Sequence, residues 1–186
     1  MDIKAKGVAQ FETNLFLKAL SFAAYKHRHQ HRKGSKGIPY INHPIAVADL
    51  LVRTGNIRDP DTIAAALLHD TVEDTDTTLV ELEAEFGPVI SQLVAELSDD
   101  KSLPKEERKR PQVEHAPSLS HRARIVKLAD KTCNLRGVVE DPPAEWSVEQ
   151  KQKYFDWAKS VVDKIRGTNV KLENAFDEAF AKRPQS

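Results

Sequence analysis

An all-α fold, a single-domain helical bundle, is the class that this sequence predicts, and three observations support it. Apolar residues recur every three or four positions along most of the chain. Capping residues, prolines and glycines stand where these stretches begin and end. No stretch shows the alternation of apolar and polar residues that a half-buried strand requires. We therefore expect helices joined by loops of ordinary length.

The first two helices are predicted on either side of a basic segment. One covers about residues 8–27 and the other about residues 44–53. The apolar face of the first is formed by Phe11, Leu15, Ala19, Phe22 and Ala23. Residues 28–40 contain two glycines and a proline among several basic side chains, so we expect a basic loop there.

A third helix is predicted from its first residues. Asp59 followed by Pro60 is a strong start, because an aspartate caps free backbone N–H groups and a proline fits the first helical turn. The apolar run at residues 63–68 leads directly into four ionisable side chains at helical spacing. On a helix, these four side chains would lie on one face.

Further helices are predicted along the rest of the chain. Thr78 with Glu81, and Ser147 with Gln150, have the spacing of a capping box. The expected helices cover about residues 78–87, 88–97, 104–114, 121–139 and 147–161, with a final one ending near residue 181 after a break at Gly167.

Length and composition fit one globular domain over residues 1–186. The chain is 40% hydrophobic and 30% charged, and Lys plus Arg and Asp plus Glu both number 28. Zero net charge argues against a general nucleic-acid binder, which usually has a basic excess. Cys133 is the only cysteine, which excludes an intrachain disulfide and fits a cytoplasmic location. No signal-peptide core and no apolar run of roughly 18 residues is present, so no membrane attachment is expected.

The most informative motif follows the apolar run of the third helix. His69, Asp70, Glu73 and Asp74 stand three and four residues apart, so their side chains can converge on one site. The simplest interpretation is a helix end with solvated acids. Acids are unfavourable at the negative end of a helix dipole, however, and costly to bury without a cation. A metal ion would compensate them.

Two further motifs supply candidate ligands. Lys127, Asp130, Lys131 and Asn134 form one polar stripe on a helix. Taken alone, this stripe predicts a solvated face. His43 precedes Pro44 at a helix start, where a single histidine is commonly a core or capping residue.

Together these motifs give a ligand set of two imidazoles and two carboxylates. Its members are His43, His69, Asp70 and Asp130. Mixed nitrogen and oxygen donors suit Mn²⁺, Fe²⁺ or Zn²⁺ better than Ca²⁺.

The order of these ligands resembles the H…HD…D signature of HD-domain metal-dependent phosphohydrolases. Segments 40–44, 66–75 and 126–131 are similar, more narrowly, to the hydrolase domain of RelA/SpoT enzymes and above all to the stand-alone small alarmone hydrolases. The resemblance runs from about Phe16 to Phe180 and includes residues 99–105 and 146–157. It implies an HD-domain helical bundle.

The resemblance also implies roles for the site residues. It assigns one Mn²⁺ to His43, His69, Asp70 and Asp130, with Zn²⁺ or Fe²⁺ also suited to these donors. Glu73 and Asp74 would position or deprotonate the attacking water. This is chemically sensible, because a divalent ion lowers the pKa of its water towards neutrality and a nearby carboxylate can take the proton.

Five residues match positions that contact the nucleotide in this family. Arg32 and Lys33 lie in the basic loop and would face the base or the phosphates, whereas Lys105, Asn134 and Tyr154 would contact phosphates or sugar. The basic loop has two other interpretations, a solvated turn and an adventitious metal site at His27 and His31.

The expected activity is removal of the 3′-pyrophosphate from guanosine 3′,5′-bis(diphosphate) (ppGpp) or its 5′-triphosphate analogue (pppGpp), giving GDP or GTP and pyrophosphate. With about twenty residues outside the matching region, we expect no synthetase domain. Three alternatives stay open: a phosphatase for the 2′-phosphate of NADPH, an inactive nucleotide sensor and a structural helical adaptor. The intact Glu73–Asp74 pair favours an enzyme. Both a monomer and a homodimer fit the sequence.

Overall fold

The computed structural model describes residues 3–104 and 107–185, without the side chains of residues 3–9 and 11, and within these limits it is built from helices. In chain order these are α1 (Ile3–Lys26), α2 (Asn42–Arg53), α3 (Pro60–Leu68), α4 (Thr71–Asp74), α5 (Leu79–Phe86), α6 (Pro88–Leu97), α7 (Lys109–His115), the 3-10 helix η1 (Ala116–Ser118), α8 (His121–Glu140), α9 (Val148–Asp163) and α10 (Val170–Phe180). The only β-pairing in the described part is two isolated bridges. The all-α prediction is confirmed.

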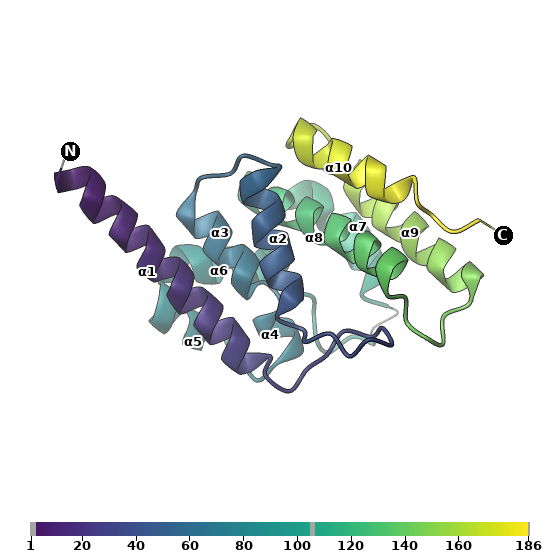
Figure 1. Cartoon of the computed structure of the whole chain (residues 1–186), viewed down its shortest axis with the longest axis horizontal. Helices are drawn as coiled ribbons and strands as arrows, with labels where there is room; N and C mark the ends of the chain where they lie inside the picture. The colour runs from purple at the N-terminus through teal and green to yellow at the C-terminus, as the bar shows by residue number, and fades with distance from the viewer. Residues whose placement is uncertain (1–2, 105–106, 186) are drawn as a thin grey trace.

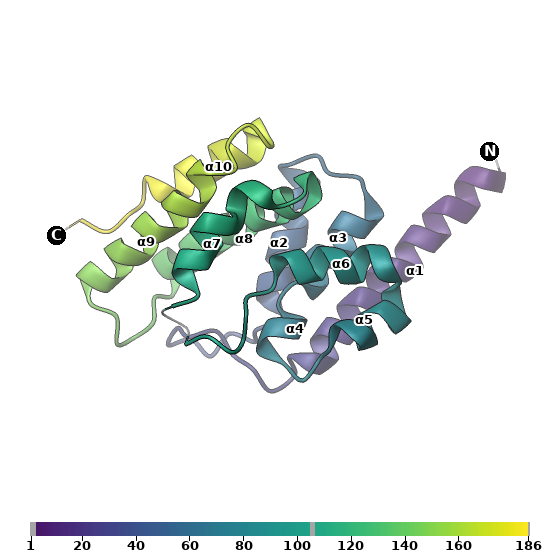
Figure 2. The ribbon, with the colours of Figure 1, turned by 180° about the vertical axis from the view of Figure 1, so that it is seen from behind.

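The core is organised around α3 and α8. Helix α3 packs against α1, α2, α6 and α8, and its Ala64, Ala65 and Ala66 are fully buried. A helix that is apolar on all sides belongs in the middle of a bundle. Helix α8 also contacts α9 and α10, which lie at the opposite end from α1 (Figure 1). Figure 2 shows α5, α6 and α7 on the other face.

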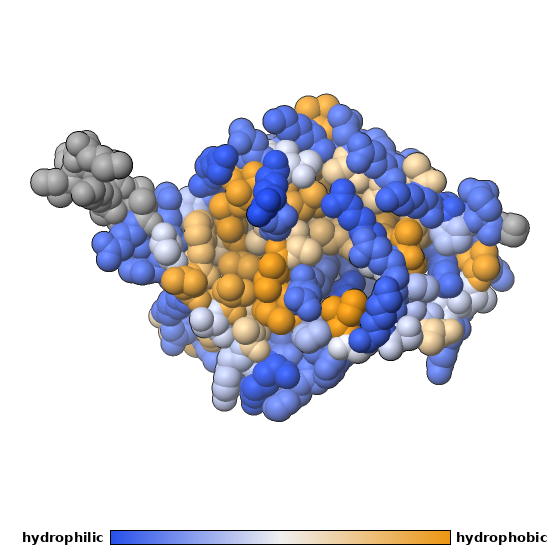
Figure 3. Space-filling view, viewed as in Figure 1, coloured by the Kyte–Doolittle hydropathy of each residue, from blue (hydrophilic) through white to orange (hydrophobic). Residues whose placement is uncertain are grey.

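Apolar side chains are also found at the surface of the bundle. Figure 3 shows apolar side chains gathered over α2 and its neighbours α1 and α3. Leu17 of α1 and Ile45 of α2 are among the large apolar residues that are exposed. Among the described residues, no helix combines the length and apolar character needed to cross a bilayer.

The predicted caps are confirmed, one of them in part. Asp59 accepts a hydrogen bond from the backbone N–H of Thr62 (3.0 Å), with proline at the first helical position. Ser147 and Gln150 form a reciprocal capping box at the start of α9. Thr78 accepts the N–H of Glu81, but the Glu81 carboxylate pairs with Lys26 Nζ (3.0 Å) instead of closing the box.

Three predicted helix starts are displaced. Helix α1 begins at Ile3 and not near residue 8, and α2 begins at Asn42 and not at residue 44. Helix α7 begins only at Lys109, although proline at position 104 predicted an earlier start. Here the side chain of Arg108 donates to the carbonyls of Lys101 and Leu103, which ties it to the turn at residues 101–103.

The helical spacing of the residues from His69 to Asp74 is interrupted in the structure. Helix α3 ends at Leu68 and α4 begins at Thr71, with His69 and Asp70 between them. The cause is local, because His69 Nδ1 donates to the carbonyl of Ala66 (2.8 Å) and Thr71 Oγ1 donates to that of Leu68 (2.7 Å). Side chains thus satisfy carbonyls at the end of α3.

A substitution of Phe155 tests the packing of α9 on the rest of the bundle. The Phe155 ring is fully buried and lies 6.1 Å from the ring of Phe180, centroid to centroid. We expect Phe155→Ala to lower the free energy of unfolding by about 3–5 kcal/mol, because it leaves a cavity. Val170, which is 70% exposed, supplies the control: Val170→Ala should change it by less than about 0.5 kcal/mol. Urea unfolding followed by circular dichroism measures both, and equal midpoints would contradict this packing.

Candidate active site

A cavity of about 660 Å³ opens between the loop that follows α1, the α3–α4 turn and helices α8 and α9. It brings together residues far apart in the sequence. Its polar floor and walls include His43, His69, Asp70, Glu73, Asp74, Asp130, Asn134, Arg32, Lys33, Lys131, Arg108 and Tyr154. A cavity of this size accommodates a nucleotide-sized ligand.

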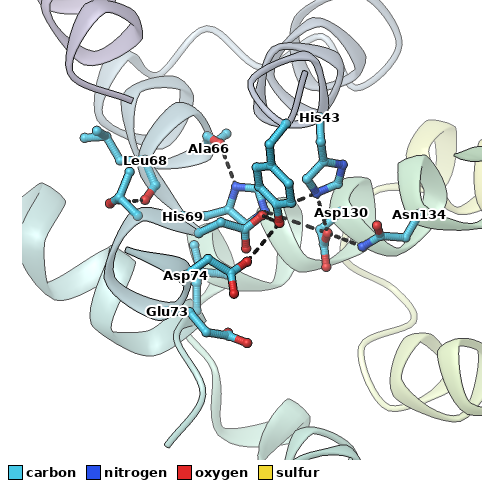
Figure 4. Close-up of polar contacts among 12 residues, drawn as sticks. His43, Ala66, Leu68, His69, Glu73, Asp74, Asp130 and Asn134 are labelled. Carbon is cyan, nitrogen blue, oxygen red and sulfur yellow. Dashed lines mark hydrogen bonds and ion pairs between the residues drawn. The ribbon is translucent and has the colours of Figure 1, made fainter. Parts of the chain in front are cut away.

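Three predicted ligands meet at the floor of this cavity. His43 from the start of α2, His69 from the α3–α4 turn and Asp130 from α8 are all buried, and each offers one ligand atom within 4.8 Å of the others. Figure 4 shows these side chains pointing toward one another. His43 Nε2 lies 3.1 Å from Asp130 Oδ1.

Asp70 completes the predicted set. Its Oδ2 lies 3.1 Å from His69 Nε2 and 3.6 Å from His43 Nε2. The break between α3 and α4 allows this placement, because it lets neighbouring residues direct both side chains into one site. The structure therefore brings together all four residues predicted as ligands.

The hydrogen bonds of His69 test whether this site suits a metal ion. Since the carbonyl of Ala66 accepts from Nδ1, Nδ1 carries the proton and Nε2 of the neutral ring offers a lone pair. That Nε2 is buried and has no hydrogen-bond partner among the described residues. A buried lone pair beside two carboxylates fits a divalent cation.

The same grouping perturbs the pKa values of the cluster. Burial disfavours a charged His69, but the carboxylates of Asp70 and Asp130 outweigh it and raise its pKa to about 10, so Nε2 binds a proton wherever no metal ion takes its place. Burial likewise opposes ionisation of Asp130, yet Lys131 and the two histidines hold its pKa well below the usual range. For His43, burial dominates and lowers the pKa. The cluster therefore favours bound positive charge.

Glu73 stands beside the cluster in a different environment. Its Oε2 accepts the backbone N–H of Asp99 (3.2 Å), and its Oε1 lies 3.6 Å from Arg108 Nη1. Burial, followed by the negative charges of Asp99 and Asp70, raises the pKa of Glu73. A carboxylate with a raised pKa is a better proton acceptor than an ordinary one.

Asp74 is held by residues that the sequence analysis did not select. The hydroxyl of Tyr40 lies 3.0 Å from Asp74 Oδ2 and 2.7 Å from Asp70 Oδ2, so it links the two carboxylates. Gln30 donates to the backbone carbonyl of Asp74 (2.6 Å). Tyr40 is the first residue of segment 40–44, one of the segments that carry the family resemblance, and this position was the available signal.

The polar stripe of α8 is not the solvated face that the stripe taken alone would indicate. Lys127, Asp130 and Lys131 are all buried. Lys131 Nζ lies 3.2 Å from Asp130 Oδ2 and 4.4 Å from the centre of the Trp157 ring, while Lys127 Nζ donates to the carbonyl of Leu97. Helix α9 and the end of α6 lie over the stripe, so it faces the cavity and not the solvent.

Four of the five predicted nucleotide contacts line the cavity. These are Arg32, Lys33, Asn134 and Tyr154, while Lys105 lies outside the described residues. Arg32 Nη2 donates to Asn134 Oδ1 (2.8 Å), and Asn134 Nδ2 donates to Asp130 Oδ1 (2.6 Å). The basic loop is thus connected directly to the histidine–carboxylate cluster.

His27 and His31, the pair considered above as an adventitious metal site, have separate environments. His27 is buried, with its Nδ1 2.7 Å from Gln30 Oε1 and its ring stacked on Tyr40, whereas His31 is exposed. Burial of one ring and exposure of the other do not favour a shared metal at this pair.

Comparison with known proteins gives consistent matches. The HD domain family matches residues 19–156. The guanosine-3′,5′-bis(diphosphate) 3′-pyrophosphohydrolase MESH1 of Danio rerio is 53% identical over 171 residues, covering 92% of this chain and 95% of that protein. Its Homo sapiens counterpart is also 53% identical, covering 92% and 96%. A solved structure, described as a metazoan ortholog of SpoT that hydrolyzes ppGpp and plays a role in starvation responses, superposes with a TM-score of 0.88 at 48% identity, covering 91% of this chain and 95% of that one.

Proposed function

The chain belongs to the HD domain family, among the relatives of the MESH1 hydrolases, and from this premise we propose that it is a guanosine-3′,5′-bis(diphosphate) 3′-pyrophosphohydrolase. The observation that carries the proposal is the buried cluster of His43, His69 and Asp130 at the floor of a nucleotide-sized cavity, with three further carboxylates, those of Asp70, Glu73 and Asp74, beside it. The substrates are ppGpp and pppGpp, and the products are GDP or GTP and pyrophosphate.

His43, His69, Asp70 and Asp130 hold one divalent cation in this proposal. Neutral imidazole nitrogens and carboxylate oxygens suit Mn²⁺, with Fe²⁺ and Zn²⁺ as the alternatives. When bound, such an ion supplies positive charge that makes water more acidic and offsets the negative charge of phosphoryl oxygens. The free lone pair of His69 Nε2 and the low pKa of Asp130 both support binding of a cation here.

Glu73 and Asp74 orient and deprotonate the attacking water. Glu73 is fixed by the N–H of Asp99, and Asp74 by the hydroxyl of Tyr40, so neither carboxylate is free to rotate away from the cluster. The water attacks the phosphorus that is attached to the 3′ oxygen. The bond between that phosphorus and the 3′ oxygen breaks, the 3′ oxygen takes a proton, and pyrophosphate leaves.

The basic wall of the cavity holds the phosphates and the base. Arg32 and Lys33 extend from the loop, and Asn134 and Tyr154 face them from α8 and α9. Arginine offers paired donors and a planar stacking surface, whereas lysine offers a compact charge. Lys105 is proposed for the same role on the family resemblance. Every proposed residue comes from one chain and one domain, residues 1–186, so a monomer or either half of a homodimer would suffice.

The test is release of pyrophosphate from ppGpp with Mn²⁺, run beside release of phosphate from NADPH. We expect rapid pyrophosphate release that falls at least about 10³-fold after chelation, because metal catalysis contributes several kcal/mol, and that returns on adding Mn²⁺. Phosphate release from NADPH alone would replace the proposed substrate. Binding of ppGpp without turnover would indicate a sensor, and no binding of metal or nucleotide would indicate a structural adaptor.

A further inference from the structure

The basic loop folds back on itself into a short strap, defined here as residues 30–40. The N–H of Arg32 donates to the carbonyl of Ile38 (2.8 Å), and the N–H of Tyr40 donates to that of Gln30 (2.9 Å). Tyr40, the last residue of the strap, contacts the carboxylates of Asp70 and Asp74, so the base of the strap lies beside the histidine–carboxylate cluster. Two residues of its tip (residues 34–36), Gly34 and Lys36, also line the cavity.

The tip is fastened to the residue that follows α8. One carboxylate oxygen of Asp141 accepts the N–H (3.0 Å) and the hydroxyl (3.2 Å) of Ser35, and the other accepts the N–H of Lys36 (3.2 Å). Lys36 Nζ also donates to the carbonyl of Glu140 (3.1 Å), and Gly34 forms a bridge with Pro143. Charge-assisted bonds to two successive N–H groups fix a backbone segment more firmly than neutral ones.

Gly34 makes this attachment sterically possible. A Cβ atom at Gly34 would lie 2.0 Å from Asp141 Oδ2 and 2.6 Å from the Asp141 carbonyl oxygen. Neither the carboxylate nor the backbone of Asp141 could keep its place beside a side chain there. The attachment therefore depends on two residues that are 107 positions apart, Gly34 and Asp141.

The attachment lies at the cavity wall and directly follows Arg32 and Lys33 along the strap. Gly34, Lys36, Asp141 and Pro143 all line the cavity, and Arg32 and Lys33 directly precede Gly34. Arg32 is fixed by Asn134 on one side, but its neighbours depend on the tip. A strap fixed at both ends presents its charges without further ordering when a ligand binds.

We propose that Asp141 is a positioning residue that holds the strap across the cavity and thereby sets the affinity for the phosphorylated nucleotide. The proposal rests on the proposed function. Asp141 acts through Arg32 and Lys33 and takes no part in bond breaking, which is the task of the cluster near the base of the strap. Loss of the attachment should therefore raise KM and leave kcat nearly unchanged.

The direction of the change in KM separates this positioning role of Asp141 from a simple effect of its charge. A carboxylate that lines an anion-binding cavity repels its ligand, so removing it for charge alone should lower KM. Loss of the attachment should raise KM, because binding must then order the strap. The direction of the shift for Asp141→Ala thus decides between the two.

The experiment compares four variants in steady-state hydrolysis of ppGpp. We expect Asp141→Ala and Gly34→Ala each to raise KM about tenfold with kcat within about twofold, as lost ordering of a few side chains predicts. The double variant should be no worse than either single one, because both remove one attachment. Glu145→Gln, the same charge change at an exposed residue of the same segment, should match the parent. A lower KM, a fall in kcat alone, or multiplied effects in the double variant would overturn the proposal.

Limited proteolysis tests the attachment without reference to activity. Trypsin cleaves after the lysines and arginine of the strap, so the first cut within residues 32–36 should be several-fold faster in both single variants than in the parent and Glu145→Gln. Equal cleavage rates would overturn the attachment. Faster cleavage in a protein that does not hydrolyse ppGpp would retain the attachment and reject the proposed function, so the two failures can be told apart.

Discussion

Replacing Asp130 by asparagine should lower pyrophosphate release from ppGpp at least about 10³-fold, because the cation that supplies several kcal/mol of transition-state stabilisation loses an anionic ligand. Asp130 is the carboxylate most enclosed by positive or neutral donors: His43 Nε2 lies 3.1 Å away and Lys131 Nζ 3.2 Å away. Asparagine keeps the size and one acceptor oxygen but removes the charge. Bound Mn²⁺, measured by elemental analysis after gel filtration, should fall with the activity.

Asparagine is a better probe here than alanine. Lys131 is buried against Asp130, and removing one partner of a buried ion pair typically costs about 3–5 kcal/mol. Both substitutions remove that partner, but Asp130→Ala also leaves a cavity and removes the oxygen that accepts from Asn134 Nδ2, so it is the more prone to lose activity by unfolding, which thermal unfolding would reveal. The matched control is Asp49→Asn, an exposed acid on α2 that pairs only at the surface with Arg53. Full metal content in Asp130→Asn, or equal losses in Asp49→Asn, would contradict the ligand role.

Sequence reasoning predicted most of the fold because its signals are local. Asp59 accepts the N–H of Thr62 three residues on, and Ser147 and Gln150 cap each other within one turn. Such contacts depend on neighbours in the chain and not on tertiary packing. The break at His69 and Asp70 is also local, yet it was missed. A histidine and a threonine that bond back to helix carbonyls look the same in sequence as ones that face solvent.

The polar stripe of α8 shows where local signals end. Lys127 and Lys131 have the spacing of an ordinary solvated face, and only remote partners reveal their burial. These partners are the carbonyl of Leu97 on α6 and the ring of Trp157 on α9. No periodicity records which helix will cover which face, so the stripe became informative only through the family resemblance.

The contacts of Asp141 and Tyr40 were beyond prediction for a related reason. Each joins segments about 30 to 106 residues apart through side-chain contacts with backbone or carboxylate atoms. An aspartate after a helix and a tyrosine before a helix are common in any sequence. The proposed metal ligands, in contrast, were found because their residue types are costly to bury and their order is distinctive.

Burying several ionisable groups around one cavity has a consequence for stability. Glu73 has a raised pKa because burial and its acidic neighbours oppose its charge. A group with a folded-state pKa above its unfolded value stabilises the fold below the unfolded pKa, and that contribution is lost as the pH rises through the folded pKa. Ionised Glu73 therefore weakens the folded state at neutral pH.

Replacing Glu73 by glutamine should accordingly lower activity and raise stability. We expect kcat to fall about 10²–10⁴-fold, the usual contribution of a general base, because an amide cannot take a proton. Glutamine can still accept the N–H of Asp99, so the local backbone should keep its place. In metal-free protein at pH 7, the midpoint of thermal unfolding should lie above that of the parent. The difference should shrink as the pH falls through the raised pKa of Glu73, where the parent side chain becomes neutral.

Glu83→Gln provides the comparison, since Glu83 is an exposed acid on α5 and should change neither activity nor midpoint. The two readouts of Glu73→Gln then separate the possible roles. Lost activity together with a raised midpoint would show that the ionised carboxylate of Glu73 destabilises the fold but is required for catalysis. A lowered midpoint would mean that the ion pair with Arg108, at 3.6 Å, outweighs burial, and that Glu73 is structural. Retained turnover would leave proton transfer to Asp74 alone.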